Sequence, residues 1–198
     1  MANKRDDRSV IREQPVTYDD YASMPDDGNR YEIIDGALEM MSPGPSTFHQ
    51  SVSAELEFMF KQSCRADYVI LHAPIDVILS QTTVLQPDIL MIHRDRLEIV
   101  KLHGIEGAPD LVVEILSPGS RKRDKVVKAK VYAKYQVPEY WLVDPAGRTL
   151  EQYRLIDDRY ELAELFSAED RVVSDRLPFV SFALNDIFIE VDGLKLPT

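Results

Sequence analysis

The sequence has a single cysteine, Cys64, among its 198 residues. One thiol cannot form an internal disulfide, which is typical of proteins from a reducing compartment. No apolar run approaches the roughly 18 residues that a membrane-spanning helix needs. The charged N-terminal segment is not followed by the apolar stretch of a secretory signal. We therefore expect a soluble cytoplasmic protein that does not contact a membrane.

Positive charge is also scarce, because 23 lysines and arginines stand against 34 aspartates and glutamates, a formal net charge of -11. This balance is unfavourable for an enzyme that must bind phosphates. The basic residues are, however, concentrated between Arg121 and Lys134, where the only acid is Asp124. A local basic helix on an acidic chain fits an enzyme that binds an anion in one place. It fits a solvated helix face equally well.

Several common kinds of site are missing from the sequence. The four histidines are too far apart in sequence to show zinc-ligand spacing with each other or with Cys64. No glycine-rich phosphate-binding loop or dinucleotide fingerprint is present. His49 stands near the start of a predicted helix and could approach an active site, although the simpler interpretation is an ordinary helix-terminal histidine.

Apolar residues make up 44% of the chain, enough to form a core. Residues 1–16 are polar without periodicity and predict a flexible tail, so a single domain is expected over 17–198. A short helix is predicted at 17–24, and a hairpin is predicted around the Asp35-Gly36 pair because such a pair favours a tight turn. From Ser46 or Thr47 to about Cys64, apolar residues recur every three or four positions, which predicts a long helix.

The second half of the chain alternates short apolar runs with turn residues. The expected strands span 68–71, 75–79, 84–92, 111–116, 139–143, 150–155 and 160–165. Between the fourth and fifth of these, a helix is predicted from Ser120 to about Tyr135, with Val127, Val131 and Tyr135 facing inward. The order hairpin, helix, strands, helix, strands predicts one α/β domain.

Two carboxylates occupy consecutive predicted strands. Asp88 follows Pro87, and Glu114 lies inside the apolar run LVVEIL. An unpaired buried carboxylate is costly, so a cation is expected beside Glu114. If the two strands are neighbours, both acids converge on one point, which suits Mg²⁺. The alternative is that Asp88 caps a turn while Glu114 pairs with a core arginine such as Arg30.

The predicted helix after Glu114 carries a second stripe beside its inward one. At about 100° per residue, this stripe contains Arg121, Asp124, Lys128 and Tyr132. Lys128 is the lysine best placed to reach inward, where its ammonium could orient an attacking hydroxide or hold a phosphate. Asp124 could fix its position, although an ordinary surface pair between the two is the alternative.

The run PDLVVEILSPGS, followed by Asp124, Lys128, Tyr132 and VPEYWLVDP, resembles the Uma-type (Uma-two) restriction endonuclease family of the PD-(D/E)XK nuclease superfamily. The resemblance includes RYEIIDGALEMMSP, the helix with His49, and QPDILMI, and it covers roughly residues 17 to 155. It implies a restriction-endonuclease-like mixed β-sheet core flanked by helices.

The same resemblance implies a set of site residues. Asp88 and Glu114 would bind Mg²⁺ or Mn²⁺, with Glu32 as a further acid and the backbone carbonyl of Ile115 as a further ligand. The alternative for Glu32 is a strand glutamate that faces solvent. The superfamily's lysine is expected two residues after the second acid, and here that position holds Leu116.

In the Uma-type family the lysine is thought to have moved to the following helix, where Lys128 matches it. Asp124 and Tyr132 would support this lysine, while Arg121 and Lys122 would meet the nucleic-acid backbone.

These residues predict a metal-dependent phosphodiesterase, an endonuclease acting on nucleic acid. DNA is the expected substrate by analogy with the superfamily alone. A homodimer would suit cleavage of both strands. The alternative is a non-catalytic binding or structural module that keeps the nuclease fold, which the net charge of -11 favours. Hydrolysis of another phosphate ester in the same pocket is a third interpretation.

Overall fold

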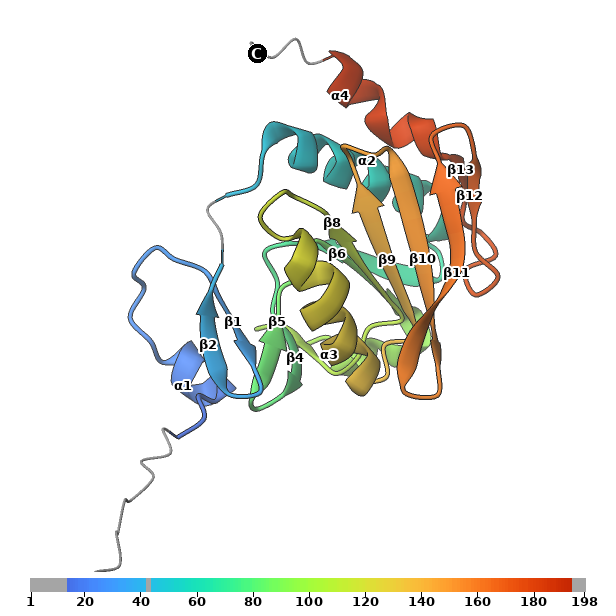
Figure 1. Ribbon diagram of the computed structural model, residues 1–198. Helices are drawn as coiled ribbons and strands as arrows, with labels where there is room; N and C mark the ends of the chain where they lie inside the picture. The colour runs from blue at the N-terminus through green and yellow to red at the C-terminus, as the bar shows by residue number, and fades with distance from the viewer. Residues whose placement is uncertain (1–13, 42–43, 194–198) are drawn as a thin grey trace, which may run out of the picture.

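The computed structural model describes residues 14–41 and 44–193, and Figure 1 shows their arrangement. The first element is the short helix α1 (Tyr18–Ala22), which is held by a capping box between Thr17 and Asp20. This confirms the short helix expected there. Most of the tail predicted for residues 1–16 lies outside the described residues.

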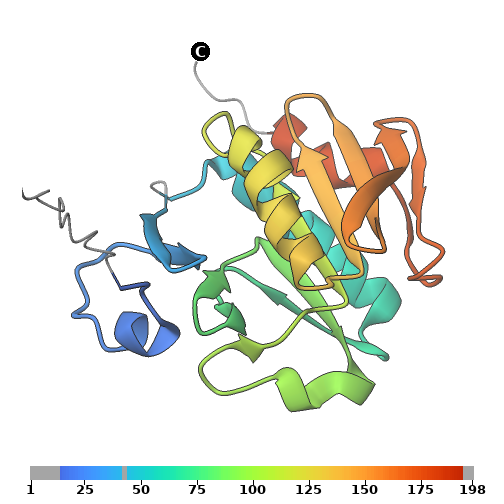
Figure 2. The ribbon, with the colours of Figure 1, turned by 60° about the horizontal axis from the view of Figure 1, so that its bottom comes forward.

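A smaller sheet of five strands follows, in the order β2-β1-β5-β4-β7. Its first hairpin joins β1 (Tyr31–Ile34) to β2 (Ala37–Met40) through Asp35 and Gly36, which both have positive φ. The hairpin confirms the turn predicted from this pair. The remaining strands are β4 (Val77–Ser80), β5 (Thr83–Leu85) and β7 (Ile105–Glu106). In Figure 2 the hairpin and α1 stand to one side of the rest of the chain.

The larger sheet has six strands in the order β11-β10-β9-β8-β6-β3. Only β8 and β9 pair in parallel, and the other neighbours are antiparallel, so the sheet is mixed. Its strands are β3 (Tyr68–His72), β6 (Ile89–His93), β8 (Leu111–Ile115), β9 (Glu139–Asp144), β10 (Thr149–Ile156) and β11 (Arg159–Ser167).

The prediction of a single strand over 84–92 is wrong, because the segment is divided between the two sheets. β5 ends at Leu85, β6 begins at Ile89, and residues 86–88 connect them. Pro87 explains the break, since proline has no N–H to donate to a neighbouring strand. The division places Asp88 at the junction of the two sheets rather than inside a strand.

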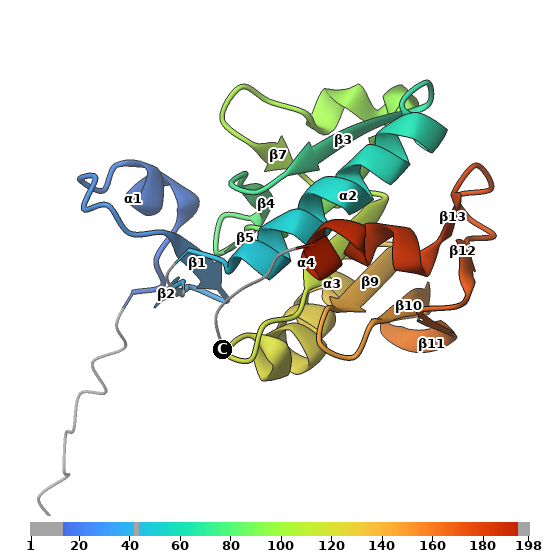
Figure 3. The ribbon, with the colours of Figure 1, turned by 90° about the horizontal axis from the view of Figure 1, so that it is seen from above.

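Helices cover both faces of the larger sheet, as Figure 3 shows from above. α2 (Thr47–Cys64) begins at its cap Ser46 and packs on one face of β8 and β9. The helical segment after β8 packs on the opposite face through Val131 and Tyr132. Because side chains alternate along a strand, Glu114 shares this second face with Val112. The mixed sheet flanked by helices confirms the predicted fold class.

The segment after β8 differs from the predicted regular helix. It contains a π-helical part, η2 (Arg123–Lys128), followed by α3 (Ala129–Lys134). Val127, expected to face inward, is 38% exposed, whereas Lys128 is 4% exposed. The wider π turn shifts which side chains face the sheet, so the expected apolar stripe is replaced at this end by buried charge.

The chain ends with elements that the sequence did not predict. These are the short pair β12 (Arg171–Val173) and β13 (Ser181–Ala183), then η3 (Leu184–Phe188) and α4 (Ile189–Gly193). A 3-10 segment, η1 (Arg94–Ile99), follows β6. None of the helices in the described part of the chain is long and apolar enough to cross a membrane.

Candidate active site

Asp88 and Glu114 come together at the end of two neighbouring strands. β6 pairs with β8 through Ile89 and Val113, and one further step in this register sets Asp88 opposite Glu114. The Ile115 N–H donates a 2.8 Å hydrogen bond to Asp88 Oδ2. Asp88, directly before β6, and Glu114, inside β8, therefore converge as the sequence predicted.

Glu114 is buried and surrounded by donors from the facing helix. Its Oε1 accepts hydrogen bonds from Lys128 Nζ at 2.9 Å and from the Tyr132 hydroxyl at 3.0 Å. Burial nevertheless raises the pKa of Glu114 well above its usual value, against the effect of Lys128. The negative charge at this position is therefore incompletely compensated by the protein itself.

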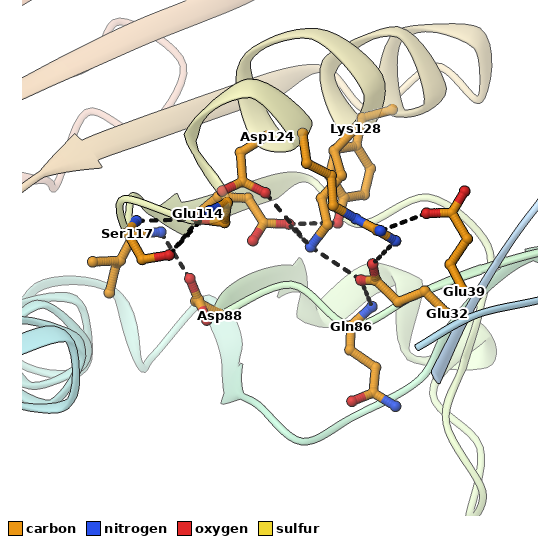
Figure 4. A network of polar contacts seen from close by, with 12 residues as sticks. Glu32, Glu39, Gln86, Asp88, Glu114, Ser117, Asp124 and Lys128 are labelled. Carbon is orange, nitrogen blue, oxygen red and sulfur yellow. Dashed lines mark hydrogen bonds and ion pairs between the residues drawn. The ribbon is translucent and has the colours of Figure 1, made fainter. Parts of the chain in front are cut away.

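Lys128 reaches inward, as predicted, and lies between three carboxylates (Figure 4). Besides Glu114, its Nζ lies 3.0 Å from Glu32 Oε1 and 3.9 Å from Asp124 Oδ1. Burial opposes its charge, but the surrounding acids keep the pKa of Lys128 above its usual value. Lys128 is therefore a fixed positive charge and not a proton acceptor at neutral pH. Burial raises the pKa of Asp124 despite Lys128.

Glu32, on β1, is held through both of its oxygens. Its Oε1 accepts the Gln86 N–H at 2.9 Å as well as Lys128, and its Oε2 accepts Arg123 at 2.6 Å. Burial raises its pKa, but Lys128, the Gln86 N–H and Arg123 together hold it below the usual value. Arg123 also pairs with Glu39 at 2.5 Å. Glu32 thus links the small sheet to the helix that carries the lysine.

His49 belongs to this site, contrary to its interpretation as an ordinary helix-terminal residue. Its Nε2 lies 3.0 Å from Asp88 Oδ2, and its side chain is 11% exposed. The Ser46 hydroxyl, which caps α2, accepts the His49 N–H. The Nδ1 of His49 is buried and has no hydrogen-bond partner among the described residues. The sequence signal was available, since His49 stands in the first turn of a predicted helix.

These side chains surround a cavity of about 620 Å³. Its walls come from the β1–β2 hairpin, the start of α2, residues 72–74, the 86–88 connection, the end of β8, the segment after it and η2. Five carboxylates line it: Glu32, Glu39, Asp88, Glu114 and Asp124. Arg123 and Lys128 pair with four of them, whereas among the described residues the Asp88 carboxylate contacts only His49 and the Ile115 N–H. The region around Lys128 and Asp88 is consequently rich in negative charge.

This excess of negative charge fits a divalent cation. Among residues 14–41 and 44–193, no three His, Cys, Asp or Glu side chains are grouped closely enough to hold a metal ion. Two carboxylates with a backbone carbonyl are nevertheless enough for Mg²⁺, which usually keeps several waters. Within the described residues, nothing donates a hydrogen bond to Asp88 Oδ1 or Glu114 Oε2. One oxygen of each acid is thereby left for a cation.

Lys122 and Arg121, the two residues predicted to contact nucleic acid, differ in their position relative to the cavity. Lys122 lines the cavity. Arg121 is not among the residues that line it and instead pairs with Asp144 at 2.8 Å. The cavity is also lined by Arg30, which the sequence suggested only as an ion-pair partner for Glu114. No contact between Arg30 and Glu114 occurs among the described residues, where Lys128 takes that place.

The Uma2 family model, described as "Putative restriction endonuclease", matches residues 18–185. The chain belongs to the Uma2 family. A similar solved structure is that of "a putative nuclease belonging to DUF820" from Anabaena variabilis ATCC 29413, with a TM-score of 0.71. It is 21% identical to this Uma2 chain and covers 88% of it and 98% of the solved chain, which shows a shared fold. A search of curated proteins found no match.

Proposed function

We propose that this Uma2 protein is a metal-dependent nuclease that hydrolyses phosphodiester bonds in nucleic acid, with DNA as its expected substrate. The observation that carries the proposal is the meeting of Asp88 and Glu114 at one cavity, with the Lys128 ammonium 2.9 Å from Glu114. The family description and the name of the similar solved structure point in the same direction.

Asp88 and Glu114 would hold Mg²⁺ or Mn²⁺, with the Ile115 carbonyl as a third protein ligand. Such an ion, when bound, activates a water and neutralises charge on the phosphodiester. A bound cation would also stabilise the charged form of Glu114, which burial disfavours. Binding by Glu32 as well stays a prediction, because both of its oxygens already accept hydrogen bonds.

The remaining side chains position these groups. Lys128, as a permanent cation beside Glu114, would stabilise negative charge that develops on the phosphate or the attacking hydroxide. Tyr132 and Asp124 would hold this lysine and its partner in place. His49 and the Ile115 N–H both contact Asp88 Oδ2, so the other oxygen of Asp88 would serve as the metal ligand.

The test compares the wild-type protein with Asp88→Asn and Glu114→Gln on DNA and RNA, with Mg²⁺, with Mn²⁺ and with EDTA. Cleavage is expected only with the metals and only in the wild type. Glu151→Gln is a matched control, because Glu151 pairs with Lys125 and does not line the cavity. Circular dichroism checks that each variant folds. Cleavage that both site variants retain in full would refute the assignment.

The competing function is a binding module that has kept the fold without catalysis, which the net charge of -11 favours. A calorimetric Mn²⁺ titration separates the two. The nuclease proposal predicts Mn²⁺ uptake that Asp88→Ala removes. Absence of uptake, or uptake unchanged in that variant, would favour the binding module. Assays on nucleotides beside DNA test for another phosphate ester as substrate.

A further inference from the structure

Four basic side chains line the cavity, and they fall into two kinds. Arg123 and Lys128 are neutralised by carboxylates at distances between 2.5 and 3.9 Å. Arg30 and Lys122 have no carboxylate oxygen within 4.0 Å in the part of the chain that the structure describes. The cavity therefore contains two cations whose charge remains available.

Other basic side chains of the described residues, such as Lys130, also have no carboxylate oxygen within 4.0 Å. Arg30 and Lys122 differ from Lys130 because they line the cavity. Two neighbouring basic residues that do not line the cavity are paired: Arg121 with Asp144 and Lys125 with Glu151. A paired cation must give up its carboxylate before it binds another anion, whereas Arg30 and Lys122 need not.

The two cations come from different elements. Arg30 directly precedes β1 at the open end of the hairpin, where its carbonyl accepts the Met41 N–H at 2.8 Å. Lys122 directly precedes η2. Each stands two residues before an acid of the site, Glu32 and Asp124 respectively. The positive charges thus come from the hairpin and from the helical segment, the two elements that also supply these acids.

We propose that Arg30 and Lys122 bind two different phosphates of the nucleic-acid strand that enters the cavity, an inference that rests on the proposed nuclease function. The guanidinium of Arg30 suits paired hydrogen bonds to phosphate oxygens, and the ammonium of Lys122 acts as a mobile point charge. The ligand is accordingly a strand with at least two phosphates, and not a mononucleotide.

The test measures binding of a fluorescent oligonucleotide by anisotropy over a series of salt concentrations. An Asp88→Asn background in Mg²⁺ prevents cleavage. Arg30→Gln and Lys122→Gln are each expected to weaken binding about tenfold and to reduce the slope of log K against log salt by roughly 0.7 to 0.9. In the double variant, the slope should be reduced by the sum of the two single reductions, as expected for two separate phosphates.

Three controls make the outcome specific. Lys125→Gln removes a neighbouring cation that does not line the cavity and should leave binding within about twofold. Arg30→Lys keeps the charge and should retain the salt slope while it loses part of the affinity. Circular dichroism identifies any variant that fails to fold. If Arg30→Gln does not fold, Arg30→Lys and Lys122→Gln still test the proposal.

The result separates this inference from the proposed function. Unchanged affinity and slope in Arg30→Gln and Lys122→Gln, with cleavage by the wild type intact, would overturn the phosphate contacts alone. Loss of binding in these variants, with no cleavage by the wild type, would support the contacts and refute the nuclease. A double variant no worse than the weaker-binding single variant would overturn the assignment of two phosphates.

Discussion

At the scale of single residues, the contact between His49 and Asp88 has a consequence for metal binding. A donor that fixes a carboxylate ligand typically contributes 10- to 100-fold to metal affinity. His49→Ala should therefore weaken Mn²⁺ binding by about this factor in a calorimetric titration. His49→Gln should bind nearly as well as the wild type, because its amide can place an N–H close to the position of Nε2. Equal loss in both variants would argue against a positioning role.

Cys64 allows a prediction about pH. It is fully buried against the core, and burial raises the pKa of its thiol from 9.0 to about 11. The unfolded chain then loses its thiol proton at lower pH than the folded chain does. The contribution of Cys64 to the free energy of unfolding is complete below pH 9.0 and is lost as the pH rises toward 11. The loss is at most about 1.4 kcal/mol for each pH unit.

Urea unfolding across this pH range measures the effect. Cys64→Ala should show a shallower decline in the free energy of unfolding than the wild type between pH 9 and 11. Parallel curves for the two proteins would contradict the prediction. A thiol reagent adds an independent check, because Cys64 should react slowly in the folded protein and rapidly in urea.

The residues of the site differed in how far the sequence could predict them. Glu114 is informative because a carboxylate in an apolar strand needs a cation, and its contact with Lys128 meets that need. His49 and Arg30 do not lie inside a comparable apolar run of the sequence, so nothing there indicated a buried polar side chain that needs a partner. Their place in the site depends on long-range packing, such as the contact between His49 and Asp88 across 39 positions. One sequence does not specify such neighbours.

At the scale of elements, η2 determines which side chains of the helical segment are buried. Val127 is 38% exposed in η2, whereas Val131 in α3 is 6% exposed. A regular helix would have buried both. Val131→Ala should lower the free energy of unfolding by about 1.5–3 kcal/mol, since it removes buried methyl groups from a packed core. Val127→Ala should change it by less than about 0.5 kcal/mol.

Urea denaturation of these two variants tests the arrangement directly, because the substitution and the helical segment are the same in both. Similar losses of stability would mean that Val127 is buried and that the helix is regular. The comparison concerns stability alone, because Val127 also lines the cavity.

The elements themselves were largely predictable where local patterns are strong. α2, the hairpin and β8 followed from apolar periodicity, turn residues and a continuous apolar run. The π-helical η2 did not, because the ordinary helical period was assumed at every position. β12 and β13 have three residues each, too few to show an alternating pattern. Their pairing depends on tertiary contacts.

At the scale of the whole molecule, the net charge of -11 and the cations of the cavity act over different distances. We expect a nucleic acid that approaches from solution to meet the overall negative field before it reaches Arg30 or Lys122. The Debye length is about 30 Å at 0.01 M salt and about 8 Å at 0.15 M. Screening therefore weakens the long-range repulsion while the short contacts inside the cavity are affected less.

The association rate constant for an oligonucleotide should consequently rise as salt increases from about 0.01 M to about 0.15 M, the reverse of the usual steering by a basic surface. The dissociation rate constant should rise as well, because the phosphate contacts inside the cavity are also weakened. Stopped-flow anisotropy with the Asp88→Asn protein measures both constants. An association rate that falls steeply with salt would show that a basic surface dominates the approach, so that the acidic surplus lies away from the path of the substrate.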